Sequence, residues 1–368
     1  MGSTRGVKQE LDEWGAIQRL LPPGWEEEAK NKGALVRARG IRSGEALLRI
    51  LLIHLALGCS LKETAIRART VGLGRVSSVA LFKRLKSSEE WLRWLSERMW
   101  SGGGGRLVSS EVRVRAVDAT VVSEPGSTGT DWRVHYCVDL RNLQCDFFQL
   151  TDGKGGETWR RIPVRRGDVL LGDRAYGTPP GVGHVLGKGG EVVVRMNLTN
   201  LPLYSAEGER VDPLKKVRGL RVGQVGEWSL SVHSPQGEVF KGRLIALKRS
   251  GASTQATQKK ILRETRRKGK EPSQRTLSAA RFFFLWTSLP AERWSAEQAL
   301  ELYRIRWQIE LAFKRMKSIM GLGHLPKKDP SSARAWLHGK IFVSLLVERL
   351  MDEAEAFSPW GYPLGQPT

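Results

Sequence analysis

The sequence contains few cysteines and no long hydrophobic run. There are three cysteines in 368 residues, and their spacings are unlike those of metal ligands. The odd number argues against a disulfide framework and indicates a reducing compartment. The most apolar stretch, residues 47–59, is too short to span a bilayer and includes Arg49. The N-terminus lacks the apolar segment of an export signal. We therefore expect a soluble cytoplasmic protein without membrane association. The cysteines are Cys59, Cys137 and Cys145.

Acidic residues are also scarce relative to basic ones. The chain has 38 Asp plus Glu against 60 Lys plus Arg, which gives a formal net charge of +22. Such an excess favours a polyanionic partner, and nucleic acid is the commonest one. A generally basic protein from a host that favours arginine is the alternative. A hydrophobic content of 40% fits a globular protein of two or three domains.

The first hundred residues are expected to be helical. Residues 60–70 and 77–86 predict two short helices joined by a glycine-containing turn, the outline of a helix-turn-helix. The second helix carries Lys83 and Arg84, which are suited to phosphates or base edges. An ordinary helical hairpin would give the same pattern. The glycine run at 101–105 predicts a linker that ends this domain.

Beyond the linker the pattern changes to strands that carry two aspartates. Residues 111–117 alternate and lead to Asp118, and the apolar run 168–172 leads to Asp173. Aspartate after a strand is also a common turn residue, and we assign Asp168 to a turn. Asp118 differs because apolar residues flank it on both sides, where an unpaired charge is costly. A bound cation would relieve that cost.

Residues 295–322 predict one uninterrupted helix of about seven turns, because Ser295 and Gln298 form a capping box and no glycine or proline occurs before Gly321. Polar residues lie together on one face, opposite an apolar stripe. An ordinary surface helix would also place charges there. The residues on the polar face are Tyr303, Arg306, Glu310, Lys314 and Lys317.

The region 197–280 has a different character. Residues 227–247 predict a β-hairpin, and residues 259–270 form a strongly basic segment. From 241 to 280 there are twelve Lys or Arg residues and two Glu residues. A run of charged residues exposed to solvent is the ordinary explanation, but so large an excess of basic over acidic residues favours DNA contact. An apolar strand follows at 281–287, so the basic block is expected to be an insertion. Its candidate DNA-binding residues are Arg266, Arg267 and Lys268.

These residues carry a resemblance to a known family. Tyr303, Arg306, Glu310 and Lys317 have the spacing Tyr-x2-Arg-x3-Glu-x6-Lys, and Val-Asp-Ala-Thr and Gly-Asp-Arg-Ala-Tyr surround the two aspartates. The chain from residue 60 to about 350 resembles the bacterial insertion-sequence-four transposases, which are DDE enzymes with a Tyr-Arg-Glu-Lys signature.

The resemblance implies an α/β fold in three parts. A helical N-terminal DNA-binding domain would cover residues 1–105, and a ribonuclease-H-like catalytic domain would cover 106–350, with a C-terminal tail at 351–368. A β-rich insertion would interrupt the catalytic domain at about 197–280. Asp118, Asp173 and Glu310 would be the catalytic acids. They would hold two Mg²⁺ ions, for which Mn²⁺ could substitute, with Asp118 bridging both.

The implied reaction is cut-and-paste transposition. Cleavage at the inverted-repeat ends would free a 3′-hydroxyl that attacks target DNA, in some families through a hairpin end. Tyr303, Arg306 and Lys317 would hold phosphates, and Trp307 or Trp286 would stack on a flipped base. Bringing two ends together implies a homodimer acting at the bacterial nucleoid.

Two alternatives remain from the sequence. One is a nuclease or resolvase on the same scaffold, which would cut without joining. The other is a transposase-derived DNA-binding protein that has lost catalysis, although all three acids are present.

Overall fold

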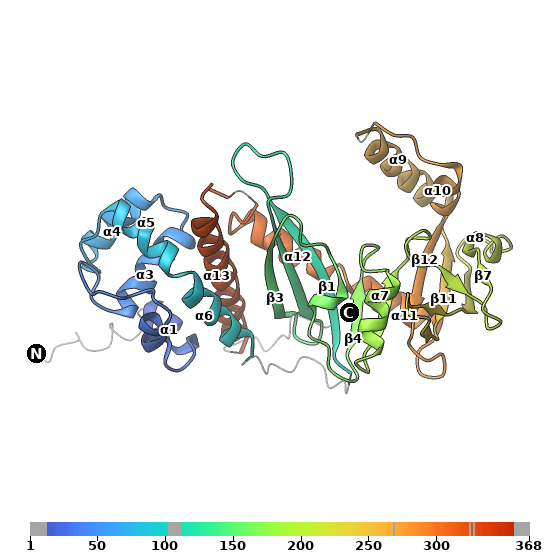
Figure 1. Ribbon diagram of the computed structural model, residues 1–368, viewed down its shortest axis with the longest axis horizontal. Coiled ribbons are helices and arrows are strands. Elements are labelled where there is room, and N and C mark those ends of the chain that lie inside the picture. Colours follow the sequence, from blue (N-terminus) through green and yellow to red (C-terminus); the bar gives the residue numbers. More distant parts are fainter. Residues whose placement is uncertain (1–12, 102–111, 268, 324, 327, 357–368) are drawn as a thin grey trace, which may run out of the picture.

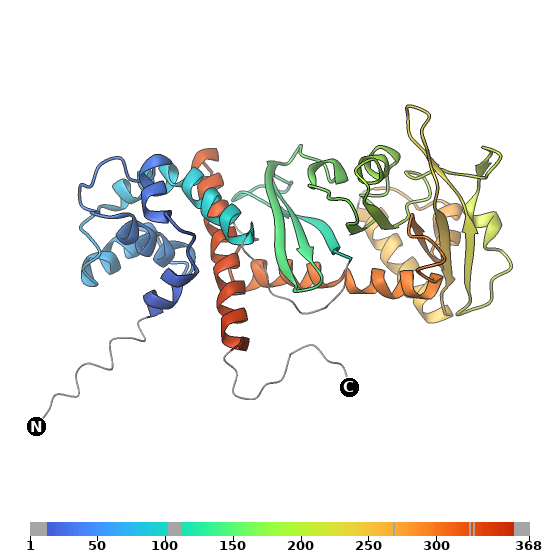
Figure 2. The same ribbon diagram turned by 90° about the horizontal axis from the view of Figure 1, so that it is seen from below.

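The computed structural model describes residues 13–101, 112–267, 269–323, 325–326 and 328–356. The molecule is elongated, with a helical lobe at one end, a large sheet in the middle and an insertion with a projecting helix at the other end (Figures 1 and 2). Most of the predicted glycine linker and of the C-terminal tail lies outside the described residues. None of the described helices combines the length and apolarity needed to cross a membrane.

The described part of the N-terminal lobe, residues 13–101, consists of six helices around aromatic and aliphatic side chains. Serine side chains accept a backbone N–H at the start of α3, α4 and α5, which fixes where these helices begin. Trp25 stacks on Trp91 with ring centroids 6.3 Å apart. The helical N-terminal region is thus confirmed. The helices are α1 (Glu13–Leu20), α2 (Trp25–Asn31), α3 (Gly44–Leu55), α4 (Leu61–Thr70), α5 (Ser78–Ser87) and α6 (Glu89–Ser101).

The central element is a mixed eight-stranded sheet in the order β3-β2-β1-β4-β5-β12-β11-β8. Strands β1, β4 and β5 are parallel, and the other pairs are antiparallel. This mixed α/β sheet is consistent with the ribonuclease-H-like fold that the resemblance implies. The strands are β1 (Val114–Val122), β2 (Trp132–Asp139), β3 (Gln144–Asp152), β4 (Val169–Gly172), β5 (Glu191–Arg195), β8 (Val225–Ser229), β11 (Arg243–Lys248) and β12 (Phe282–Thr287).

Helices cover both faces of this sheet. On one face, alternate strand residues such as Leu171 pack with α11 (Ala296–Ile305), and α12 (Gln308–Ser318) continues along β1. On the other face, Leu170 packs with Trp159 of the short 3-10 helix η1 (Trp159–Arg161) and with α7 (Pro179–Leu186). The alternation follows from the two-residue period of a strand.

The predicted single helix over 295–322 is wrong, because the structure has two helices in its place. The capping box at Ser295 is confirmed. At Arg306 and Trp307 the backbone changes to tighter bonds: the N–H of Arg306 donates to Tyr303 O (3.1 Å), and the N–H of Glu310 donates to Trp307 O (2.9 Å). Figure 2 shows that α11 and α12 still follow each other along the sheet.

The β-hairpin predicted over residues 227–247 is confirmed. Strands β8 and β11 pair antiparallel and extend the main sheet, and residues 232–233 pair with 239–240 in the same register near the turn. The basic segment belongs to α9 (Gly251–Arg267), which projects from the body and has no buried residue (Figure 1). The other elements are β6 (Leu203–Tyr204), β7 (Arg210–Val211), α8 (Pro213–Lys216), β9 (Val232–His233), β10 (Val239–Phe240) and α10 (Gln274–Ala279).

The last described helix packs against both the N-terminal lobe and the central sheet. Helix α13 (Pro330–Ala356) packs against α6, α5, α3 and α1 of the lobe and against β3 of the sheet. Its buried residues Trp336, Ile341 and Phe342 belong to the same core as residues of the lobe and of α12. This helix thus packs within the chain, on both the lobe and the sheet.

Candidate active site

The two predicted aspartates lie side by side on neighbouring parallel strands. In the pairing of β1 with β4, Val114 is opposite Val169 and Ala116 is opposite Leu171. The same register two residues further places Asp118 opposite Asp173, which directly follows β4. Both side chains are on the face covered by α11 and α12, because side chains alternate along a strand.

Glu310 reaches the same face from the first turn of α12. The helix is held on the sheet by buried Ile309 and by Phe313, whose ring lies 5.9 Å from that of Tyr136 on β2. The Asp118 side chain is 18% exposed and that of Glu310 is 60% exposed. The acids therefore come from two strands and one helix, and one of them faces solvent.

Arg306 connects the acids. Its Nη1 donates to Asp118 Oδ2 at 3.2 Å, and its Nη2 donates to Glu310 Oε1. Its guanidinium also lies 5.6 Å from the centre of the Tyr303 ring. The arginine is thus placed between two of the predicted catalytic carboxylates.

The environment of Asp118 disfavours its charged form. Burial raises the pKa of this carboxyl to about 6, the backbone N–H of Ala119 lowers it, Asp173 raises it and Arg306 lowers it. The net result is a carboxylate that would gain from additional positive charge at neutral pH.

A fourth acid lies nearby that the sequence analysis missed. Glu157 pairs with Arg133 (3.7 Å). Burial raises the pKa of Glu157, Asp173 raises it further, and Arg133 lowers it. Its segment is anchored by Trp159, whose ring packs directly on Gly172. Glu157 lies on a loop, where hydrophobic periodicity gives no information.

Tyr176 is buried close to Asp118, Glu157 and Asp173. Its side chain is almost fully buried, and its hydroxyl has no hydrogen-bond partner among the described protein atoms. Burial raises the pKa of this hydroxyl well above its usual value, and Asp118, Glu157 and Asp173 add to the effect. It is a polar group available to the acid cluster.

A row of arginines extends from the acids across the sheet. The sequence analysis did not identify these arginines. Arg195, at the end of β5, lies 5.3 Å from the ring centre of Phe283, and Arg249 lies 5.5 Å from it. Tyr303 packs against the same ring at 5.5 Å. Burial lowers the pKa of Arg195, and Arg174 lowers it further by repulsion. Such crowded cations favour an anionic ligand.

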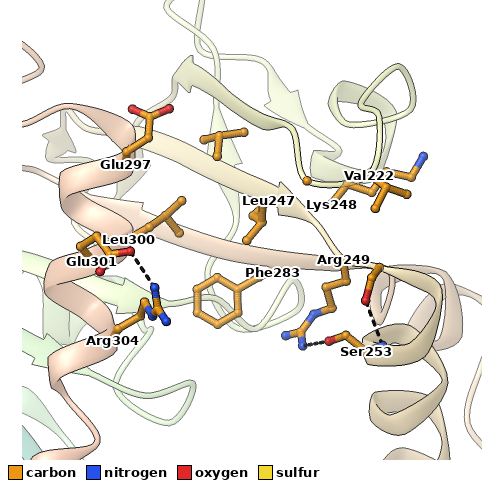
Figure 3. Close-up of a pocket in the computed structure, with 13 residues that line it drawn as sticks. Val222, Leu247, Lys248, Arg249, Ser253, Phe283, Glu297, Leu300, Glu301 and Arg304 are labelled. Atoms are coloured by element: carbon orange, nitrogen blue, oxygen red, sulfur yellow. Dashed lines mark hydrogen bonds and ion pairs between the residues drawn. The ribbon is translucent and has the colours of Figure 1, made fainter.

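Two grooves meet at Phe283. One, of about 570 Å³, lies between α11 and the base of α9. Figure 3 shows Phe283 between Arg304 and Arg249 in this groove, with Leu300 beside them. The other, of about 300 Å³, is lined by Arg174, Arg195 and Arg275 among others. The face that carries the acids therefore continues as an arginine-lined surface.

The remaining helix residues differ in exposure. Lys314 and Lys317 are exposed on α12, and the Trp307 side chain is 50% exposed. Tyr303 is buried rather than open on the polar face. Trp286 is fully buried on β12 and donates its ring N–H to Leu230 O (3.0 Å), so its ring offers no free surface for a base.

The predicted DNA-binding cations outside α11 and α12 also differ in exposure and in hydrogen bonding. Arg266 and Arg267 are exposed at the end of α9, and Lys268 lies outside the described residues. Lys83 is exposed on α5. Arg84 is different, because its guanidinium donates to two backbone carbonyls of its own lobe. Two of its N–H groups are therefore engaged within the protein.

The carboxylates fit a hard divalent cation by their chemistry, because oxygen ligands are those that Mg²⁺ prefers. The raised pKa of Asp118 points the same way. Among the described residues, however, no three acids, histidines or cysteines already stand close enough to form a metal site. Metal binding by the three acids would require Glu310 to leave its ion pair with Arg306.

Two aspartates at neighbouring strands and a glutamate on a helix packed against the sheet are an arrangement typical of DDE enzymes. Residues 110–346 match the family model of the transposase DDE domain. The chain is 34% identical over 356 residues to the putative transposase InsL for insertion sequence element IS186A of Escherichia coli (strain K12), covering 95% of this chain and 96% of the relative. It is 34% identical over 357 residues, with the same coverage of both chains, to the transposase for insertion sequence element IS421 of Escherichia coli. A more distant relative is the transposase for insertion sequence element IS231F of Bacillus thuringiensis subsp. israelensis, 25% identical over 277 residues, 67% of this chain and 58% of the relative. The chain belongs to the DDE transposases of the insertion-sequence-four type.

Proposed function

We propose that this transposase cuts DNA at the inverted-repeat ends of its insertion sequence and joins the freed 3′-hydroxyl to target DNA. The observation that supports this most is the parallel register that sets Asp118 beside Asp173, with Glu310 linked to Asp118 through Arg306. The crowded arginines along the same sheet face support a polyanionic substrate.

Asp118, Asp173 and Glu310 would hold two Mg²⁺ ions, for which Mn²⁺ would substitute. Bound there, the metal would activate the attacking oxygen and neutralise charge on the leaving oxygen. Arg306 lies within reach of two of these acids and would turn toward phosphate when they bind metal. Tyr303 and Lys317 would help to position the cleaved end.

Trp307 is our candidate for stacking on a flipped base during hairpin formation, because its ring is half exposed beside Arg306, whereas Trp286 is buried. We expect Trp307→Ala to lower the yield of hairpin ends, scored on denaturing gels, without abolishing first-strand cleavage. Phe283 is the other accessible aromatic side chain on this face, and Phe283→Ala is the comparison. An unchanged hairpin yield in the Trp307 variant would remove this role.

The other proposed contacts to DNA are Lys83 in the lobe and Arg266, Arg267 and Lys268 near the end of α9. Recognition of two ends implies a homodimer in the synaptic complex, at the nucleoid. Gel filtration with and without paired end DNA tests this, and a lasting monomer on paired ends counts against it.

The central test is cleavage of a labelled duplex that carries the element's end, with Mg²⁺ or with EDTA. We expect metal-dependent cleavage and joining to a plasmid, both reduced at least about 100-fold in Glu310→Gln, because one metal ligand is lost. Glu90→Gln is the matched control, since Glu90 is an exposed glutamate on α6, away from the grooves at Phe283, that pairs with the neighbouring Arg93 (2.6 Å).

Two outcomes would select the alternatives. Cleavage without joining would identify a nuclease or resolvase. Binding of end DNA without cleavage under any metal condition would identify a catalytically silent DNA-binding protein.

A further inference from the structure

A loop of the N-terminal lobe is fastened to the start of α5. The backbone N–H of Arg75, just before this helix, donates to Gly40 O at 3.0 Å. From within α5, Arg84 Nη1 donates to Ala34 O at 3.3 Å, and its Nη2 donates to Arg37 O. The loop between α2 and α3 is therefore held beside the turn that leads into α5, although the two are distant in sequence.

Two glycines make this approach possible. Gly40 and Gly74 both have positive φ angles, 76° and 154°. A Cβ on Gly74 would lie 2.2 Å from Gly40 O, and one on Gly40 would lie 2.4 Å from Arg75 O. Any side chain at either position would push the loop away from the turn. The loop and α5 thus form one continuous surface.

This surface is basic and carries no counter-charge of its own. Residues 34–42 and 71–87 contain no Asp or Glu. None of its five exposed cations forms an ion pair with a described carboxylate, whereas Lys86 at the far end of α5 pairs with Asp329 (3.1 Å). The exposed cations are Arg37, Arg39, Arg42, Arg75 and Lys83.

Apolar side chains lie exposed within the same surface. Val79, in the first turn of α5, is 65% exposed, and Ala80 beside it is also exposed. Val79 and Lys83 are one helical turn apart and share a face. A partner that suits this face must offer negative charge and small apolar groups together. The major groove of DNA offers both, through its phosphates and the C5-methyl groups of thymine.

We propose that the start of α5 enters the major groove of the element's end and reads thymine through Val79 and Ala80. Lys83, Arg75 and the loop arginines then contact the flanking phosphates. Arg84 acts as a positioning residue that holds the loop against the helix. This inference rests on the proposed function, because it assumes a DNA substrate, and it adds which surface and which base group provide specificity.

The test uses the full chain in EDTA, so that DNA binds without being cut. A preferred duplex is selected from a random pool, and each thymine in it is replaced in turn by deoxyuridine, which lacks the methyl group. We expect replacement at one or two positions to weaken binding about fourfold, as for exposing one buried methyl group. Val79→Ala, which shortens the side chain by two methyl groups, should remove the difference at the thymine that Val79 contacts and leave it at a thymine that Ala80 contacts. Val239→Ala, at a valine 57% exposed on β10, should keep the difference.

The phosphate contacts are tested by the salt dependence of binding. Lys83→Ala should weaken binding to all duplexes and reduce the slope of log affinity against log salt by about one. The thermal midpoints of the variants should equal that of the native chain, because these side chains are exposed.

The outcomes separate the inference from the function on which it rests. If a motif is selected but Val79→Ala keeps every deoxyuridine penalty of the native chain and Lys83→Ala binds as the native chain does, then α5 is not the reading element and this inference is wrong. If the native chain selects no sequence and binds no DNA, the proposed function itself fails.

Discussion

At the scale of single residues, Arg306 shows how far a motif can be interpreted. The sequence predicts an arginine on the same face as Glu310, and the structure confirms that the two are neighbours. It also pairs Arg306 with Asp118, a contact across 188 positions of the chain that spacing along a helix cannot reveal. The residue expected to hold phosphate is here an ion-pair partner of two acids.

Other features at this scale were not visible because the partners are distant in sequence. Asp168 lies in a turn as predicted, since its N–H donates to Arg165 O (3.1 Å), but it is also buried and forms ion pairs with Arg113 (2.5 Å) and Arg115 (3.3 Å). Glu157 was not identified at all. In both cases the sequence shows a carboxylate but not the cation or acid that the fold brings beside it.

His338 on α13 sets a pH dependence of stability. The ring is buried against Phe148, and burial lowers its pKa to about 3, with Arg93 and Arg334 adding to the effect. In the unfolded chain a histidine takes up a proton near pH 6.5. From about pH 6.5 down to 3 only the unfolded state binds that proton, so the free energy of unfolding falls as the pH falls.

We therefore expect His338→Leu to lose less stability than the native chain between pH 7.5 and pH 5, measured by denaturant unfolding in EDTA. The raised pKa of Asp118 acts in the opposite direction over part of this range, so the informative quantity is the difference between the variant and the native chain. Equal pH slopes in the two proteins would show that His338 is not the responsible group.

At the scale of elements, the end of β4 is the most constrained position in the site. A Cβ on Gly172 would lie 2.5 Å from the Trp159 ring and 2.9 Å from Tyr176 Cβ. We expect Gly172→Ala to lower the free energy of unfolding by about 1–3 kcal/mol through overpacking. It should also reduce cleavage, because Asp173 is the next residue.

Thermal unfolding and end cleavage should be measured on the same preparations of Gly172→Ala. Gly219→Ala is the control, because no atom lies within 4 Å of a Cβ built at that glycine. A Gly172 variant that is fully active and as stable as the native chain would mean that η1 shifts easily to make room for the added methyl group. The position of Asp173 would then not depend on this packing.

The break between α11 and α12 has a physical reason that the sequence does not display. Tyr303 packs in the core over β4, β5 and β12, whereas Ile309 packs in the core shared with β1 and the lobe. A twisted sheet turns these two surfaces relative to each other, so a single straight helix cannot follow both. The sequence predicted the apolar stripe and the capping box but not the change of direction.

At the scale of the whole molecule, the hydrophobic patterns indicated a helical N-terminal part followed by an α/β part, but the role of α13 was not visible. This helix was counted with the catalytic domain, yet it packs on four helices of the lobe. Lys340 donates to Leu55 O, and Arg334 pairs with Glu89 (2.9 Å). Pairing between helices so far apart in sequence has no local signature.

We accordingly expect residues 1–101 produced alone to lack a cooperative thermal transition, because α3 and α6 would expose the side chains that α13 covers. Joining residues 330–356 to this fragment through a flexible linker should restore the transition, measured by circular dichroism. A sharp transition of the short fragment by itself would show instead that the lobe is an independent domain, as the sequence predicted.

The shared core of the lobe, α13 and α12 would fix the distance along DNA between the base pairs bound by α5 and the bond that is cut. Glu310 is on α12, and α12 is packed in the same core as the helices that hold α5. A duplex that contacted both α5 and the region of Glu310 would then be bound by one rigid body rather than by two domains joined by a flexible linker. The number of base pairs between the sequence read and the bond cut would then be fixed, and inserting half a helical turn of DNA would turn the scissile bond away from the acids.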